Sequence, residues 1–104
     1  MNNKLLSLLG LMRRAGKLSL GFDAAADSAE SGISRLILTT ADISPKTLKE
    51  LNYKINTQIE VIALNGDALE LQRAIGKAVK IISINDKGFA QKAKLLMETN
   101  NGEE

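Results

Sequence analysis

Residues 35–40 read Arg-Leu-Ile-Leu-Thr-Thr, a short run in which branched apolar side chains dominate. A run of this length and composition predicts a strand that is buried on both faces. Two similar runs lie at 59–64 and 79–84, and residues 17–19 form a shorter extended segment. These four segments together predict a four-stranded sheet.

Helical patterns separate the predicted strands. Leu5, Leu8, Leu9 and Met12 follow the i, i+3, i+4, i+7 spacing of a buried stripe, which predicts a helix over residues 3–14. Ser44 before Pro45 is typical of a helix start, since serine caps and proline fits the first turn. The further helices are expected over 22–31, 45–56, 67–75 and 86–97. Helices alternating with short apolar strands imply an α/β protein, and we expect a three-layer α/β/α sandwich with a mixed sheet.

The chain length and composition are those of one globular domain. It has 104 residues, of which 44% are hydrophobic and 25% are charged. That length can bury a hydrophobic core without disulfides or metal ions. We expect a single domain over residues 1–99 and a disordered acidic tail over 100–104.

The composition excludes several kinds of chemistry. The chain has neither cysteine nor histidine, which removes structural zinc sites, cysteine and histidine nucleophiles and imidazole acid–base catalysis. Asp42 follows a predicted strand, where we expect it to accept backbone hydrogen bonds, not to act as a catalytic carboxylate. No apolar run approaches the ~20 residues of a membrane span. We therefore expect a cytoplasmic, monomeric, non-enzymatic protein without cofactor, catalytic residues, metal or membrane partner.

Positive charge is concentrated in two segments that are far apart in the sequence. Residues 1–22 contain four cations and no acidic residue, and residues 77–94 contain five lysines and one aspartate. If the fold brings these segments together, they form one basic patch suited to a polyanion. Arg13 and Arg14 could instead only complement the dipole at the end of their helix.

The segment Gly16-Lys-Leu-Ser-Leu-Gly21 joins the first basic segment to the predicted helix over 22–31. Both glycines can serve as turn residues, and Gly21 also allows an anion to approach the start of that helix. The helix itself is rich in alanine, with Asp23 and Asp27 near its start. An alanine-lined face could equally pack against another macromolecule.

Four further motifs, in order, resemble the ribosomal protein L7Ae/L30e/S12e/Gadd45 superfamily, and within it the small bacterial YlxQ-type branch. They are Leu-Leu-Gly-Leu-Met-Arg-Arg-Ala-Gly-Lys-Leu at 8–18 with Gly21, Ala-Asp-Ile-Ser-Pro-Lys-Thr at 41–47, Arg-Ala-Ile-Gly-Lys at 73–77 and Asn-Asp-Lys-Gly-Phe-Ala-Gln-Lys at 85–92. The resemblance covers residues 4–97. It implies an α/β/α sandwich that binds kink-turn or ribosomal RNA.

The resemblance also implies where RNA binds, namely at the start of helix two and in the loop before the last strand. The family motif Gly-x-Asn-Glu-x-x-Lys corresponds here to Gly21, Asp23, Ala24 and Asp27, so three of its polar positions differ. Because each lost base contact costs ~1–3 kcal/mol, we expect looser reading of structured RNA. The predicted RNA-binding residues are Arg13, Arg14, Lys17, Gly21, Asp23, Arg73, Gly76, Lys77, Ala78 and Val79.

Two functions remain open from the sequence. The first is RNA binding through these residues, with structured RNA, ribosomal RNA or ribosome-associated proteins as partners. The alternative is a protein-interaction module that uses the alanine-rich face of the helix over 22–31. Phe22 and Phe89 are expected in the core, so we do not expect an aromatic platform for single-stranded RNA.

Overall fold

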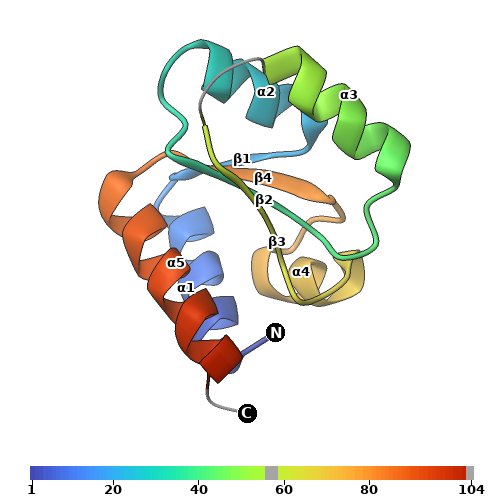
Figure 1. The fold of residues 1–104 in the computed structure, drawn as a ribbon. Coiled ribbons are helices and arrows are strands. Elements are labelled where there is room, and N and C mark those ends of the chain that lie inside the picture. The colour runs from blue at the N-terminus through green and yellow to red at the C-terminus, as the bar shows by residue number, and fades with distance from the viewer. Residues whose placement is uncertain (56–58, 103–104) are drawn as a thin grey trace.

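The structure is a computed structural model that describes residues 1–55 and 59–102. Helices and strands alternate along the chain (Figure 1). The elements are α1 (Asn3–Arg14), β1 (Leu18–Leu20), α2 (Phe22–Glu30), β2 (Leu36–Thr39), α3 (Pro45–Ile55), β3 (Val61–Ala63), α4 (Ala68–Ile75), β4 (Ile81–Ile84) and α5 (Lys87–Gly102). The predicted elements are all present, with ends that differ by one or two residues in most cases.

The four strands form one mixed sheet in the order β1-β4-β2-β3. Strand β4 runs antiparallel to both β1 and β2, whereas β2 and β3 are parallel. All residues of the two central strands β2 and β4 are buried. The predicted mixed sheet of an α/β protein is therefore confirmed, and its two central strands are the ones that are buried along their whole length.

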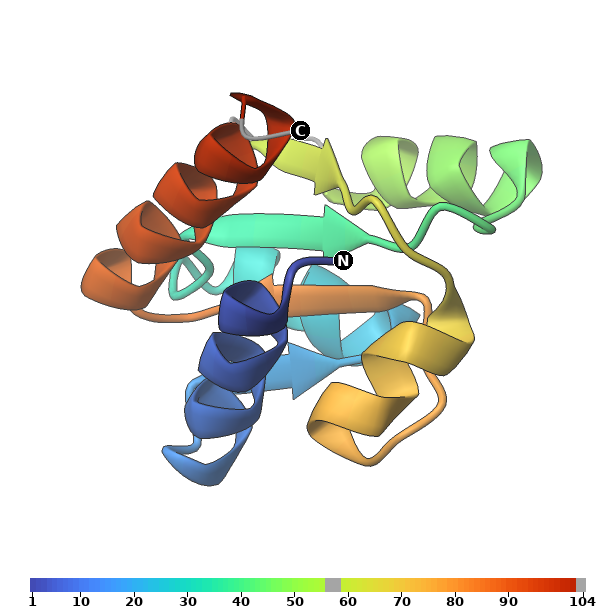
Figure 2. The ribbon, with the colours of Figure 1, turned by 90° about the horizontal axis from the view of Figure 1, so that it is seen from below.

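Helices cover both faces of the sheet, as the views in Figures 1 and 2 show. Helices α1, α4 and α5 pack on one face against Leu36, Leu38 and Ile82. Helices α2 and α3 pack on the other face against Ile37 and Ile81. Successive strand residues point to opposite faces, so neighbouring apolar residues such as Ile37 and Leu38 supply the two different cores.

Side chains cap the starts of four of the predicted helices, and at α1 the cap is Asn2 Oδ1, which accepts a hydrogen bond from the Leu5 amide at 2.9 Å. Ser44 Oγ accepts a hydrogen bond from the Thr47 amide at 3.1 Å at the start of α3. Asp67 Oδ1 accepts one from the Glu70 amide at 3.0 Å, and Asp86 Oδ2 one from the Phe89 amide at 2.8 Å. These caps satisfy amides that have no partner within the helix, which explains why the helices begin there.

The alanine-rich face of α2 lies inside the protein. Ala25 and Ala26 are fully buried and Ala29 is only 5% exposed, because small side chains let α2 pack closely on the sheet. The expectation that this face is available to a protein partner is therefore wrong. The surface that α2 presents to solvent instead carries Asp23 and Asp27.

Within the part of the chain that the structure describes, no helix combines the length and apolar character needed to cross a membrane. Helix α5 continues to Gly102, and residues 103 and 104 lie outside the described residues, as does the predicted last residue of α3 at position 56. The domain boundary at residue 99 and the disordered tail over 100–104 stay predictions.

Candidate functional site

The end of α1 is held against the end of α4. Arg13 Nη1 donates a hydrogen bond to the backbone carbonyl of Ile75 at 2.6 Å. One turn earlier on α1, a Cβ atom added at Gly10 would lie only 3.1 Å from the Ala74 carbonyl oxygen. The same Cβ position lies 3.7 Å from Arg14 Nη1, so both arginines reach the junction of the two helices.

Further cations lie at the end of α4. Gly76 ends this helix in the left-handed conformation with φ 80°, and its amide donates to the Gln72 carbonyl at 2.7 Å. Arg73 precedes this turn by three residues, and Lys77 and Ala78 follow it, all three exposed. Together with Arg13 and Arg14, this end of the molecule carries four cationic side chains, which we call the α1–α4 cluster: Arg13, Arg14, Arg73 and Lys77.

The start of α2 lies beside the segment that leads into β4. The Gly21 amide donates to the Ile81 carbonyl at 2.8 Å. A Cβ atom at Gly21 would lie 3.8 Å from Val79 Cγ1. The structure therefore brings Gly21 next to Val79, although 58 positions separate them in the sequence (79 minus 21). We call this contact region the Gly21–Val79 surface.

Gly21 gives the start of α2 an unusual form. Its φ of 97° and ψ of 170° belong to a backbone region that is essentially reserved for glycine, and no side chain caps the helix here. Such a start presents amide groups and a positive dipole end to solvent. Asp23 in the first turn is exposed and adds a negative charge at the same place. An RNA held here therefore meets both attraction and repulsion.

Lys17 lies at the other end of β1. Its carbonyl accepts a hydrogen bond from the Asn85 amide at 2.9 Å, beyond the end of β4, whereas Gly21 pairs with Ile81 at the start of β4. The length of β1 thus separates Lys17 from Gly21. Lys17 instead follows the last turn of α1, where its amide donates to the Met12 carbonyl at 3.0 Å, so it lies beside the end of α1 that carries Arg13 and Arg14.

The cations of the α1–α4 cluster have no carboxylate partner among the described residues. The described residues form two ion pairs, and both lie outside this cluster: the Met1 amino group with Glu70, and Lys94 with Glu60. Unpaired arginine and lysine side chains keep their donors available for an incoming anion. Arg13 is partly committed, because one of its donors is already used by Ile75.

A chain of polar side chains beneath α2 was not foreseen from the sequence. Ser83 donates to Asn85 Oδ1 at 2.7 Å and also hydrogen bonds with Ser34 Oγ at 2.7 Å. Asn85 Nδ2 donates to Ser19 Oγ at 2.9 Å, and the Ser19 and Ser28 hydroxyl groups bond to one another. The sequence did not predict this network, because its serines lie far apart in the chain and only the fold brings them together. The network ties α2 to β1 and β4 and so helps to fix Gly21 in place.

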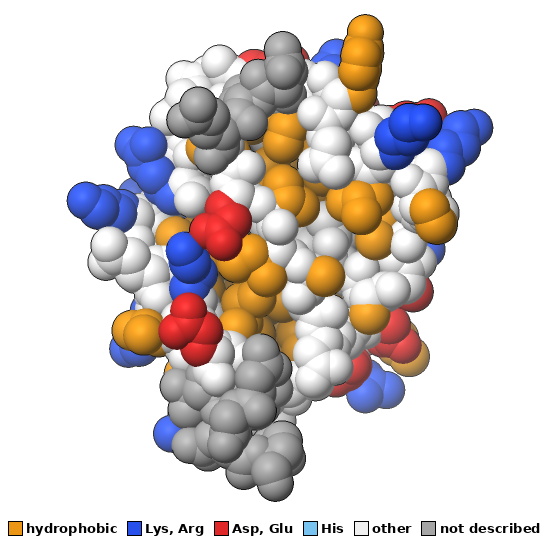
Figure 3. Space-filling view, viewed as in Figure 1, with side chains coloured by type: hydrophobic (Ala, Val, Ile, Leu, Met, Phe, Trp, Pro, Cys, Tyr) orange, Lys and Arg blue, Asp and Glu red, His pale blue; other side chains and the backbone are white. Residues whose placement is uncertain are grey.

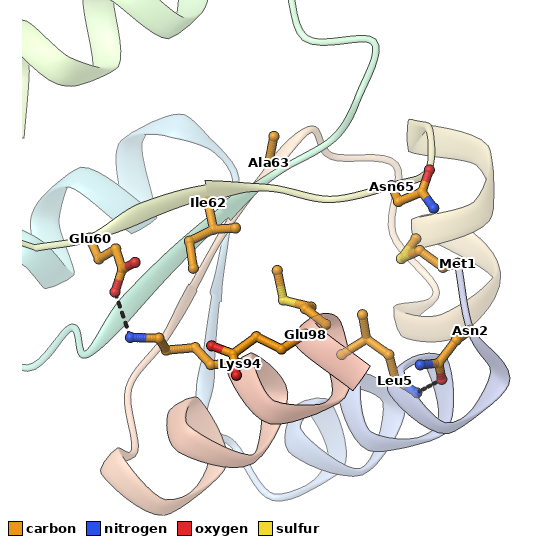
Figure 4. Close-up of a pocket in the computed structure, with 10 residues that line it drawn as sticks. Met1, Asn2, Leu5, Glu60, Ile62, Ala63, Asn65, Lys94 and Glu98 are labelled. Atoms are coloured by element: carbon orange, nitrogen blue, oxygen red, sulfur yellow. Dashed lines mark hydrogen bonds and ion pairs between the residues drawn. The ribbon is translucent and has the colours of Figure 1, made fainter. Parts of the chain in front are cut away.

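A hollow of about 190 Å³ lies beside the edge strand β3 (Figure 4). Leu5 and Ile62 point into it, and the Lys94–Glu60 ion pair of 2.7 Å closes one end by joining α5 to the segment before β3. Across the described residues, no group of three or more Asp or Glu side chains could hold a metal ion. Apolar side chains and charged or amide side chains both line the hollow.

One aromatic side chain, which the sequence analysis did not place, is exposed to solvent. Phe22 and Phe89 are half-buried against the two cores, as expected, but Tyr53 on α3 is 87% exposed. The short sequence pattern around Tyr53 gave no sign of this, since the exposure depends on which face of α3 packs on α2.

Comparisons with known proteins agree with this geometry. The model of the ribosomal protein L7Ae/L30e/S12e/Gadd45 family matches residues 3–94. The RNA-binding protein YlxQ of Enterococcus faecium is 32% identical over 96 residues, which are 91% of this chain and 92% of that protein. The RNA-binding protein YlxQ of Bacillus subtilis (strain 168) is also 32% identical, over 88% of this chain and 92% of its own length. The family expected from the sequence motifs is confirmed.

Two solved structures share the fold. A protein of unknown function from Bacillus halodurans C superposes with a TM-score of 0.83 at 34% identity, covering 93% of this chain and 99% of that one. The Giardia lamblia 15.5kD RNA binding protein superposes with a TM-score of 0.72 at 19% identity, covering 95% of this chain and 92% of that one. The second likeness concerns the fold alone.

Proposed function

Because the chain belongs to the ribosomal protein L7Ae/L30e/S12e/Gadd45 family, we propose that it is a non-enzymatic RNA-binding protein of ribosomal-protein type. The observation that carries the proposal is the contact between Gly21 and Val79. It joins the two segments that the family resemblance assigns to RNA binding, and the α1–α4 cluster adds unpaired positive charge at one end of α4. The two curated relatives are themselves named as RNA-binding proteins.

The proposed partner is a structured RNA with a kink-turn-like or ribosomal fold. Arg14, Arg73 and Lys77 would contact phosphates, and Gly21 with Val79 would fit a distorted backbone, because proteins read RNA mainly through shape and unstacked bases. Ala24 and Asp27 stand where the family pattern has a glutamate and a lysine, so we propose looser reading than that of a standard kink-turn protein.

We further propose that the protein works as a cytoplasmic monomer that meets ribosomal RNA and ribosome-associated proteins. The protein-interaction alternative has lost its original basis, because the alanine-rich face of α2 is buried. RNA binding is therefore the function that the surface supports best.

The test is fluorescence anisotropy with a labelled kink-turn duplex and the same duplex whose G·A pairs are replaced by Watson–Crick pairs. Each RNA is titrated at two salt concentrations, because binding that neutralises phosphates weakens as salt rises, with a slope set by the number of phosphates. Tighter binding of the kinked RNA would support shape reading at the Gly21–Val79 surface. Absence of salt-sensitive binding to either RNA would contradict the proposed function.

A matched pair of variants locates the binding surface. Lys77→Ala removes one charge from the α1–α4 cluster. Lys92→Ala removes one charge from α5, at the place where this helix lies next to α1. We expect Lys77→Ala to weaken binding and to lower the salt slope by about one, and Lys92→Ala to change neither. Equal effects of the two substitutions would show that the surface is placed wrongly.

A further inference from the structure

Tyr53 projects from α3 into solvent. It is 87% exposed, and it is the only tyrosine of a chain that has no tryptophan. A shallow hollow of about 470 Å³ lies next to it, lined by Phe22, Lys49, Glu50, Tyr53 and Lys54. We call the group of Phe22, Lys49, Tyr53 and Lys54 the Tyr53 platform.

The platform combines a flat aromatic ring with cations. Lys49 and Tyr53 are four residues apart on α3, so their side chains are neighbours on the helix surface. Lys54 adds a second cation, and Glu50 is the one carboxylate in the lining. Over α3, hydrophobic side chains lie among Lys and Arg side chains (Figure 3). An aromatic face with positive charge at its edge suits a nucleobase that stacks while its phosphates meet lysines.

The platform continues the Gly21–Val79 surface. Phe22 is the residue after Gly21, and its side chain lines the hollow at α3. Phe22 also packs against the core beneath α2 and α3, which fixes its position relative to both helices. Phe22 therefore links the start of α2 to the hollow that Tyr53 lines.

We propose that the Tyr53 platform binds an unpaired nucleotide that flanks the structured RNA, by stacking on Tyr53 with phosphate contacts to Lys49 and Lys54. This inference rests on the proposed function, and it adds a second contact of a different chemical kind. An acidic peptide would satisfy the lysines, but continuity with the Gly21–Val79 surface and the exposed ring favour RNA.

Tyrosine fluorescence reports on this site alone, because Tyr53 is the only tyrosine and tryptophan is absent. A single-stranded oligouridine is titrated into the protein and the tyrosine emission is recorded, with a polyglutamate peptide of equal charge as control. We expect quenching by the oligonucleotide and none by the peptide. No quenching by the oligonucleotide, or quenching by the peptide alone, would overturn the proposal, the latter in favour of an acidic protein partner.

Affinity measurements separate the platform from the Gly21–Val79 surface. The kink-turn duplex is compared with versions that carry five unpaired uridines at one end or the other. For the better-binding extended RNA, we expect Tyr53→Ala to weaken binding roughly tenfold and Tyr53→Phe to retain affinity, because stacking needs the ring and not the hydroxyl. Both variants should bind the duplex without an extension as the parent protein does.

The lysines have a matched control on the same helix. Lys49→Ala removes a charge that lines the hollow, and Lys46→Ala removes one that does not. Only the first should weaken binding of the extended RNA. Unchanged affinity of Tyr53→Ala for every extended RNA would overturn the platform while leaving the proposed function intact, whereas absence of salt-sensitive binding of the duplex by the parent protein would overturn the proposed function.

Discussion

Arg13 donates a hydrogen bond to the backbone carbonyl of Ile75 at 2.6 Å, and this bond joins the last turn of α1 to the last turn of α4. The carbonyl groups at a helix end have no partner within the helix, so a guanidinium from a neighbouring helix is a favourable one. Arg13 therefore has a structural role, while the next residue, Arg14, carries the same charge without a comparable bond to α4 among those described.

This difference predicts separable effects of the two arginines. Arg13→Ala should lower the free energy of unfolding by about 1–3 kcal/mol, because the Ile75 carbonyl loses a charged donor. Arg14→Ala should leave stability nearly unchanged and weaken RNA binding with a smaller salt slope. Urea denaturation and anisotropy titrations of both variants provide the measurement. If Arg14→Ala were the more destabilising change, the assignment of the two roles would be wrong.

Gly21 and Gly76 both have positive φ but differ in ψ, and this predicts losses of stability of different size on substitution by asparagine. Gly76 has φ 80° and ψ 9°, the left-handed helical region that asparagine tolerates, so Gly76→Asn should cost less than about 1 kcal/mol. Gly21 has φ 97° and ψ 170°, a backbone region that is essentially limited to glycine and that strains asparagine too. Gly21→Asn should therefore cost about 1–3 kcal/mol. Thermal unfolding of the two variants compares them directly, and equal losses would contradict the prediction.

The sequence predicted the fold well because its apolar patterns are strong and local. The run at 35–40 became the central strand β2, and the start signals at Ser44 and Asp67 both became observed caps. The burial of the alanine face of α2 could not be predicted, because it depends on how closely that helix approaches the sheet.

The candidate site was only partly predictable for a similar reason. Motif resemblance indicated the two segments that now meet at Gly21 and Val79, but no local pattern states that these segments lie side by side or that the Arg13 guanidinium reaches the Ile75 carbonyl. The same holds for Tyr53, whose exposure is fixed by the packing of α3 on α2. Contacts between distant segments decide all of these positions.

The burial of Ala26 predicts that this side of α2 tolerates no larger residue. Ala26→Leu should lower the free energy of unfolding by about 1–3 kcal/mol, because extra methyl groups in a packed core force neighbouring side chains apart. Ala24→Leu is the matched control, since Ala24 is half-buried on the same helix and leucine is almost as favourable in helices as alanine. Urea denaturation measures both, and similar stabilities of the two variants would show that Ala26 has free space around it.

Ala24 and Asp27 are two of the three positions at which α2 departs from the family pattern. Asp27 is exposed, and Ala24 is half-buried one residue after Asp23. If the start of α2 faces RNA, the double substitution Ala24→Glu and Asp27→Lys restores base-reading and cationic groups there. We expect it to tighten kink-turn binding by roughly tenfold, on the ~1–3 kcal/mol scale of a good base contact.

The control for this gain is Glu30→Lys, which makes the same change of charge as Asp27→Lys at the far end of α2, where Glu30 is also exposed. A general effect of net charge would strengthen binding of the kinked and the Watson–Crick duplex alike in every variant. Recognition by the start of α2 instead requires that only the double variant gains affinity, and that it gains affinity only for the kinked duplex. A gain shared by Glu30→Lys would show that α2 contributes charge and not specificity.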